Sequence, residues 1–454
     1  MLSPEKNRKL TQVDSGTPMG ELLRRFWMPA LLIEEVPEPD SDPVRVRLLG
    51  EDLVAFRDTT GRVGLVDAHC THRRAPLFFG RNEHCGLRCV YHGWKFDVDG
   101  NCIDQPNEPE STEAFRKRAK ITAYPTYEMA GIVWAYLGPQ ETMPEKPPAL
   151  EWTTLPEGYY VVSKRLQENN WVQAMEGGVD TTHVAFLHKE WDPSIPDGAN
   201  QELSAMQIRP LSATAYDDDI QLKGLELIVG DPSPRIMVEQ TDFGFWLGCR
   251  ARTKTDDYFW RITPFQLPFY KTVPPYLPTE VDEAPIPFDG HAWVPIDETN
   301  TWTYNIEWRV DRPYTKEEVA HMKSVRGPHA PTDENYVPYQ NKRNDYMIDR
   351  ELQRTASYTG MINPNVQDRA VQEMMGPIAD RSKEILGRGD LAIITFRSQL
   401  LRLCDELEQG KEPLAPSIPD EFNVRSASLL MAEETDFVRK AEPWINPKKK
   451  EPVQ

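Results

Sequence analysis

Long apolar runs are absent from this chain of 454 residues. No stretch approaches the ~18 consecutive apolar residues that a membrane-spanning helix needs. The first residues, from Met1 to Lys9, also lack the apolar core of a cleaved secretion signal. We therefore expect a cytoplasmic protein that does not associate with membranes.

Basic charge and cysteine are scarce as well. The chain has 52 Lys and Arg against 71 Asp and Glu, a net charge of -19. This balance excludes the broad basic surface that binding to nucleic acid requires. Six cysteines in 454 residues are too few and too scattered for a disulfide framework. Clustered cysteines in this chain are therefore better candidates for metal ligands.

The hydrophobic pattern divides the chain into three parts. Residues 1–40 include a short helix and are expected to pack on the C-terminal domain. Residues 41–150 alternate between apolar and polar side chains, with turn signals between the runs, and predict a small all-β domain. Residues 151–454 mix both periodicities.

Within the last part, the pattern predicts both strands and helices. Residues 264–300 are rich in proline and lack periodicity, so they are predicted to be long loops. The predicted strands cover 221–229, 235–240, 243–252, 258–263 and 302–310, and the predicted helices cover 341–357, 365–387 and 390–408.

The first motif with clear chemistry pairs cysteine with histidine twice. Cys70 and His72 are followed, after sixteen residues, by Cys89 and His92. Two thiolates and two imidazoles can hold a tetrahedral zinc ion, or a [2Fe–2S] cluster with cysteines on one iron and histidines on the other. The order Cys-x-His is unusual for zinc fingers, which favours the cluster.

The second motif is Asp180, His183 and His188, just after a helix predicted to start near Asn169 or Asn170. Residues five apart lie about 140° apart around a regular helix. Both histidines can bind one ion only if the helix bulges or ends between them. The alternative is two unrelated histidines on an amphipathic helix.

Together, the two motifs resemble the Rieske non-haem iron oxygenases, and the resemblance covers nearly the whole chain. Residues 17–20 and 176–180 look most like the phthalate dioxygenase group. The resemblance implies an α+β fold, in which an all-β Rieske [2Fe–2S] domain is joined to a helix-grip catalytic domain, an antiparallel sheet flanked by helices. It implies that Cys70, His72, Cys89 and His92 hold the cluster.

The resemblance also implies a mononuclear Fe(II) held by His183, His188 and one carboxylate, the set known as a facial triad. Residues 365–373 look like the late helix that carries this acid in the family, which points to Asp368. The acidic candidates in the helical C-terminal region are Asp345, Asp349, Asp368, Glu373 and Asp380.

The activity implied is that of a terminal oxygenase, which cis-dihydroxylates an aromatic carboxylate of the phthalate, isophthalate or phenoxybenzoate type with O₂. Its electrons would come from NADH through a flavin and iron–sulfur reductase. An O-demethylase or monooxygenase of an aromatic acid would use the same residues. A Rieske ferredoxin or a zinc protein would leave the motif at residues 180–188 without a purpose.

Family members assemble as trimers or stacked trimers, which implies self-association here. Asp180 would then bridge His183 to His92 of the partner subunit and carry electrons between subunits. A carboxylated substrate also requires a buried cation. Arg235 and Arg250 are the expected donors, and Lys271, in a predicted loop, is a further candidate.

Overall fold

The computed structural model forms two compact units. The β unit consists of residues 12–148 and 295–298, and the catalytic unit consists of residues 1–11, 149–294 and 299–454. The segment expected at 1–40 is thus divided between the two units. The residues that the structure describes are 1–110, 112–188, 227–228, 230–275, 278, 287–324, 329–355, 357–361, 363–433 and 436–447.

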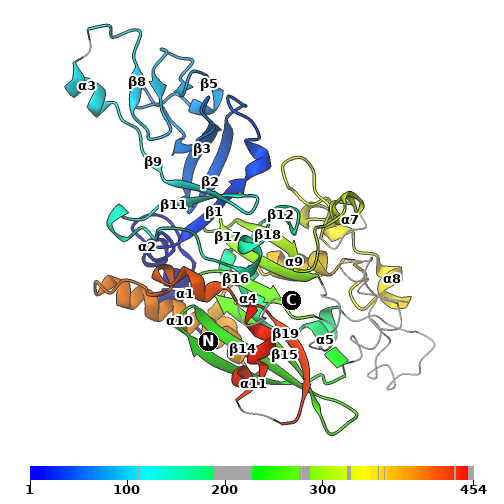
Figure 1. Ribbon diagram of the computed structural model, residues 1–454. Helices are drawn as coiled ribbons and strands as arrows, with labels where there is room; N and C mark the ends of the chain where they lie inside the picture. The colour runs from blue at the N-terminus through cyan, green and yellow to red at the C-terminus, as the bar shows by residue number, and fades with distance from the viewer. Residues whose placement is uncertain are drawn as a thin grey trace, which may run out of the picture. The chain divides into compact units, whose positions relative to one another are not determined.

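The β unit contains three small antiparallel sheets (blue to cyan in Figure 1). Its core lies between the sheets and includes Phe56, Leu87, Trp94 and Phe96, all fully or almost fully buried. The strands, in sheet order, are β1 (Trp27–Leu32), β11 (Ile132–Tyr136) and β10 (Thr126–Met129); β2 (Val44–Leu48), β3 (Glu51–Arg57), β4 (Val63–Asp67) and β9 (Ala123–Tyr124); and β5 (Arg81–Asn82), β6 (Leu87–Arg88), β7 (Lys95–Phe96) and β8 (Cys102–Asp104). Two short helices complete the unit, α2 (Pro18–Leu23) and α3 (Glu113–Arg118).

The catalytic unit is built on an eight-stranded sheet in the order β12-β18-β17-β16-β15-β14-β13, with β19 paired to β15. The pairs β12–β18, β13–β14, β14–β15, β15–β16 and β16–β17 are antiparallel. The strands are β12 (Tyr160–Gln167), β13 (Arg235–Thr241), β14 (Gly244–Arg252), β15 (Tyr258–Gln266), β16 (Tyr270–Val273), β17 (Phe288–Pro295), β18 (Thr301–Trp308) and β19 (Ala427–Met431).

Helices pack against both faces of this sheet. On the inner face, Phe265 of β15 packs against Phe396 of α10, which in turn contacts Trp171 of α4. On the outer face, Trp260 stacks on Phe437 of α11. In the described part of the unit, the α-helices are α1 (Pro4–Thr11), α4 (Trp171–Val179), α5 (Val184–Leu187), α7 (Lys316–Met322), α8 (Arg350–Thr355), α9 (Pro364–Met374), α10 (Leu391–Glu408) and α11 (Phe437–Ile445).

The prediction of long loops over 264–300 is wrong. This stretch holds the end of β15, all of β16 and all of β17. The inward residues of β16 and β17 include Lys271, Asp289 and His291, which line a cavity. Because these inward residues are polar, the apolar alternation that reveals a half-buried strand is missing.

The helix predictions are confirmed for 390–408 and only partly for 365–387, because α9 ends at Met374 before Gly376 and Pro377. The strand predicted over 221–229 lies almost wholly outside the described residues. Among the residues that are described, no helix is both long and apolar enough to cross a membrane.

Candidate functional site

The two Cys–His motifs occupy two loops of the β unit. The first loop follows β4, and the second joins β6 to β7. Each loop closes on itself through a backbone hydrogen bond, from Cys70 N to Ala75 O at 2.9 Å and from Cys89 N to Trp94 O at 2.8 Å. The loops bring the rings of His72 and His92 to a centroid distance of 4.5 Å.

The donor atoms in these loops fit a [2Fe–2S] cluster. Cys70 and Cys89 are buried, and burial, together with the neighbouring Cys89, raises the pKa of the Cys70 thiol to about 12. Nδ1 of His72 is buried and has no hydrogen-bond partner among the described residues. Because buried polar atoms are almost always bonded, this nitrogen is free to bind a group from outside the protein, and the two buried sulfurs are suitable ligands for the same group.

The second motif lies where helix α4 ends. Asn170 caps the start of α4 by accepting a hydrogen bond from Val172 N, and the extended backbone of Asp180 ends the helix. His183 and His188 then flank α5, a helix of a single turn. Because the helix ends before His183, the two rings turn to the same side, with centroids 5.2 Å apart.

Asp180 is tied to this turn and to His183. Its Oδ1 accepts hydrogen bonds from Thr182 N at 2.7 Å and from Thr182 Oγ1 at 2.8 Å, and its Oδ2 lies 3.6 Å from His183 Nδ1. Burial alone would raise the pKa of Asp180, but the contacts with His183 and Thr182 lower it to about 2. The carboxylate is therefore ionised beside the imidazole.

Asp368 joins the two histidines from helix α9. Its Oδ1 lies 3.4 Å from Nε2 of His183 and 3.4 Å from Nε2 of His188. Burial would raise the pKa of Asp368, but the two imidazoles lower it. One donor atom from each of the three residues lies within 4.8 Å of the others, a spacing that could hold a metal ion.

The other acids considered at the sequence level lie elsewhere. Asp345 and Asp349 are exposed. Glu373 is buried, but it binds Arg369 and accepts a hydrogen bond from Tyr346 Oη at 2.6 Å. Asp380 caps a turn through Ser382. Of these five carboxylates, the structure brings only Asp368 to His183 and His188.

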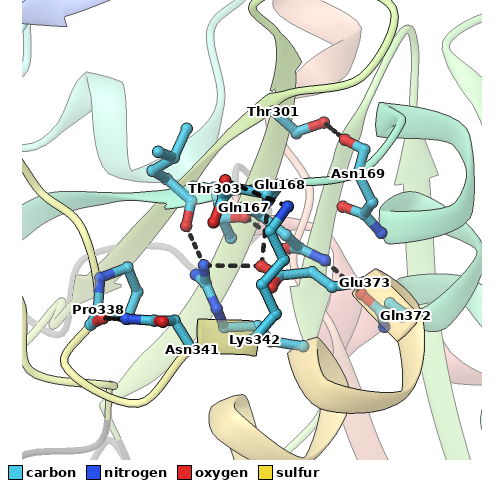
Figure 2. A network of polar contacts seen from close by, with 12 residues as sticks. Gln167, Glu168, Asn169, Thr301, Thr303, Pro338, Asn341, Lys342, Gln372 and Glu373 are labelled. Atoms are coloured by element: carbon cyan, nitrogen blue, oxygen red, sulfur yellow. Dashed lines mark hydrogen bonds and ion pairs between the residues drawn. The ribbon is translucent and has the colours of Figure 1, made fainter. Parts of the chain in front are cut away.

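Helix α9, and with it Asp368, is held in place by polar contacts to β12 (Figure 2). Gln167 Nε2 donates to Gln372 Oε1 at 2.7 Å, and Glu168 N donates to Glu373 Oε1 at 3.0 Å. Gln167 Oε1 in turn accepts from Thr303 Oγ1 at 2.9 Å. These contacts fix the register of α9 against the sheet.

Two glycines let helix α4 approach both the sheet and α9. A Cβ atom on Gly178 would lie 2.5 Å from the ring of Trp293, and one on Gly177 would lie 2.0 Å from Gln372 Nε2. Glycine inside a helix costs about 1 kcal/mol relative to alanine. The close approach places the end of α4, with Asp180 and His183, over the inner face of the sheet.

A cavity of about 150 Å³ opens beside His183, His188 and Asp368. Part of its wall is apolar and includes Val184, Val273 and Trp293. Another part carries charge, which is unusual for the inner face of a buried sheet. The cations that line the cavity are Arg165, Arg261, Lys271 and Arg369, and the acids are Asp180, Asp289 and Asp368.

Arg235 and Arg250 do not line this cavity. They lie opposite each other on β13 and β14, and both are near Glu433. Cys249 pairs with Arg261 on the inner face, so its neighbour Arg250 points to the opposite face. We correct the expectation accordingly: the cavity cations come from β12, β15, β16 and α9.

Sequence reasoning placed Lys271 in a loop and missed Arg165, Arg261, Asp289 and His291. A signal was present, because Asp289, His291 and Trp293 alternate along one strand. That pattern is typical of a strand whose buried face is partly polar.

Comparison with known protein families gives two matches. Residues 26–126 match the Rieske [2Fe-2S] domain, and residues 135–450 match the family described as "LigXa C-terminal domain like". Together these matches cover most of the chain.

Three curated relatives align over most of their own length. The oxygenase subunit of phthalate 4,5-dioxygenase from Pseudomonas putida is 38% identical, over 91% of this chain and 89% of that protein. The oxygenase subunit of 3-chlorobenzoate-3,4-dioxygenase from Comamonas testosteroni is 33% identical, over 96% and 97%. The oxygenase subunit of 5,5'-dehydrodivanillate O-demethylase from a Sphingobium species is 30% identical, over 91% and 83%.

Solved structures show the same fold at low sequence identity. The QL mutant of NdmA from Pseudomonas putida CBB5, with theobromine, superposes with a TM-score of 0.58 and 18% identity. The alignment covers 92% of this chain and 99% of that one. The likeness supports the expected fold class, an all-β domain joined to an antiparallel sheet with helices.

Proposed function

The chain belongs to the Rieske non-haem iron oxygenases, and from this we propose that it is the terminal oxygenase that cis-dihydroxylates an aromatic carboxylate. As a member of the family it is an oxidoreductase with a [2Fe–2S] cluster and a mononuclear iron. Its electrons derive from NADH through a reductase, as is typical of the family.

The observation that carries the proposal is the group formed by His183, His188 and Asp368 beside the cavity. We assign these residues as the ligands of the mononuclear iron. Two imidazoles and one carboxylate leave other positions on the metal open. Iron bound there would supply the activation of O₂, while the protein positions the ring and excludes water.

We assign Cys70, His72, Cys89 and His92 as the ligands of the [2Fe–2S] cluster. The partnerless Nδ1 of His72 and the two buried thiols support this assignment. Neutral imidazoles in place of two thiolates remove negative charge from one iron and raise its potential. His72 is further held by stacking on Trp94, with ring centroids 4.6 Å apart.

Asp180 is proposed to connect the two centres in the assembled enzyme. Its contact with His183 Nδ1 orients that ring and raises its basicity. In a trimer or in stacked trimers, Asp180 would also accept a hydrogen bond from His92 of the partner subunit. The oligomer would then be part of the electron path.

The proposed substrate is an aromatic carboxylate. Phthalate and 3-chlorobenzoate appear in the names of two relatives. In this chain, buried cations beside apolar side chains support the same class, because a buried carboxylate needs a cationic partner. We propose a flavin and iron–sulfur protein as the reductase.

The test is turnover of an acid panel with NADH, O₂ and a phthalate-type reductase. Phthalate, isophthalate, 3-chlorobenzoate and 3-phenoxybenzoate form the panel. The proposal predicts a product heavier than the substrate by two oxygen and two hydrogen atoms, with both oxygens from ¹⁸O₂. Absence of substrate-dependent O₂ uptake with every acid would overturn the substrate class.

O-demethylation is the second candidate, favoured by the similarity to the dehydrodivanillate O-demethylase subunit. It would use the same metal ligands and differ in the group that lies nearest the iron. Methoxybenzoates added to the panel separate the two reactions, because demethylation releases formaldehyde and gives a product lighter by one CH₂.

A further inference from the structure

Lys271 occupies the wall of the cavity on strand β16. It lies directly opposite His291 of β17 in the sheet register, so both side chains point to the inner face. It is 9% exposed and lines the same cavity as His183, His188 and Asp368. A lysine this deeply buried is rare unless it is paired.

The ammonium group of Lys271 has no such pair. Among the described residues, no hydrogen bond or ion pair reaches its Nζ. Its charged surroundings include Arg261, a like charge that repels it, and the acids Asp180, Asp368 and Asp289, which attract it. Two neighbouring cations in a buried cavity disfavour each other unless an anion lies between or beside them.

Two of the acids around Lys271 contact other residues, and burial disfavours the charge of the third. Asp368 faces the two histidines, and Asp180 is held by Thr182 and His183. Burial and the neighbouring Glu307 raise the pKa of Asp289 well above its usual range, which disfavours the charged form of this acid. A divalent metal at the histidines would neutralise the negative charge of Asp368. Less negative charge would then remain in the cavity to balance the ammonium of Lys271.

Two other cations of the cavity are used by the fold itself. Arg369 binds Glu373 at 3.1 Å and donates to Leu166 O. Arg165 donates to Ala330 O at 2.6 Å and to Ser163 Oγ at 2.7 Å. Lys271 is thus the cavity lysine whose charge the fold does not use.

We propose that Lys271 binds the carboxylate of the substrate and sets the enzyme's preference for acids over neutral aromatics. This inference rests on the proposed function and adds to it the residue that recognises the substrate. The ring of the substrate would lie against the apolar wall formed by Val184, Val273 and Trp293. Arg261, which repels Lys271 when the cavity is empty, would share the same anion.

The experiment measures equilibrium binding without turnover. Calorimetric titration of the anaerobic, oxidised holoenzyme uses phthalate, 3-chlorobenzoate and 3-phenoxybenzoate as probes, and the matching primary amides as neutral analogues. Wild type should bind an acid at least 30-fold more tightly than its amide. Lys271→Gln should weaken binding of the acid by about 30-fold or more and leave the amide unchanged, since truncating one partner of a buried charge pair has effects of this size.

Two further variants keep the result interpretable. Lys271→Arg retains the cation and should recover most of the binding. Lys164→Gln is the matched control, because Lys164 is also a buried lysine of this sheet but its Nζ lies 4.5 Å from the ring centroid of Tyr336. It should bind acids as the wild type does.

The outcomes separate the two levels of the argument. Wild type that binds none of the three acids overturns the proposed substrate class and this inference with it. Wild type that binds an acid no better than its amide overturns the inference, even if the Lys271 variants fail to fold. Lys271→Gln that binds the acid as tightly as wild type also overturns it and leaves the proposed function intact.

Discussion

The Nδ1 atom of His188 lies 2.7 Å from Oε1 of Gln367, the residue next to Asp368 in the chain. Gln367 Nε2 donates to Met361 O at 2.6 Å, which fixes the amide so that its oxygen faces the ring. His188 therefore donates from Nδ1, and Nε2 is the nitrogen that would bind a metal. Adjacent residues of α9 thus supply the carboxylate and orient one histidine.

Gln367→Leu should consequently weaken binding of the mononuclear metal by about 10- to 100-fold, as the loss of such an orienting partner typically does. Titration of the metal-depleted mononuclear site with Fe(II), followed by dialysis and metal analysis, measures this. Gln399→Leu is the control. Gln399 of α10 is also buried, but it donates to Gly244 O of β14. Equal metal affinity in the two variants would show that Gln367 does not orient His188 for metal binding.

Asp180→Asn should separate electron transfer from metal binding. Asparagine retains the Oδ1 acceptor that holds Thr182, so the turn should survive. The variant should keep both metal centres and a reducible cluster, yet its reduced cluster should reoxidise orders of magnitude more slowly with O₂ and substrate. Stopped-flow absorbance of the cluster measures this rate. Reoxidation at the wild-type rate would rule out Asp180 as the connection.

Lys271→Met should stabilise the protein while it abolishes acid binding. Burial and the nearby Arg261 lower the pKa of Lys271 from 10.5 to about 8. Below pH 8 the folded state must keep a buried ammonium, so its removal should raise the free energy of unfolding by on the order of 3 kcal/mol.

The pH dependence of this gain has a definite sign. Between pH 8 and 10.5 the unfolded chain binds more protons at Lys271 than the folded state does, so wild type gains stability as pH rises. The advantage of Lys271→Met should therefore be full below pH 8 and shrink above it. Urea unfolding at pH 7 and pH 9.5 measures the difference. A variant that is less stable than wild type at pH 7 would indicate that the protein itself pairs the ammonium.

Glu307 gives a second pH test with the opposite sign. Burial raises its pKa to about 8, although Arg165 and His321 act to lower it. Between pH 4.5 and 8 the folded state keeps a proton that the unfolded state loses, so stability falls as pH rises through this window. Relative to wild type, Glu307→Gln should gain on the order of 4 kcal/mol in unfolding free energy between pH 5 and pH 8. A difference that does not change with pH would contradict this.

The sequence predicted what local spacing controls. The Cys–His pairs depend on short segments, and so do the two histidines, which can act together only if their helix ends. Asp368 was expected from the family resemblance, which also rests on a short segment. The structure brings each of these sets together. The start of α4 at Asn170 was also predictable, because its capping side chain is a local signal.

The walls of the cavity were harder to predict, because they depend on which face of a strand turns inward. Alternation along β14 could not show that Arg250 faces away from the cavity, which lies on the other face with Cys249 and Arg261. On β16 and β17 the inward residues are polar, so the usual signal was absent. The loop prediction thus failed because it assumed an apolar buried face, whereas the choice of Arg250 failed because the sequence does not show which face turns inward.

The most direct test of the account is the iron content of Asp368→Ala. Wild type should contain three irons and two acid-labile sulfides per chain, two irons in the cluster and one at the histidines. Asp368→Ala should contain two irons, keep the cluster absorbance and lose turnover, whereas the exposed Asp349→Ala should contain three. An Asp368→Ala protein with three irons and normal turnover would contradict the assignment of the mononuclear site.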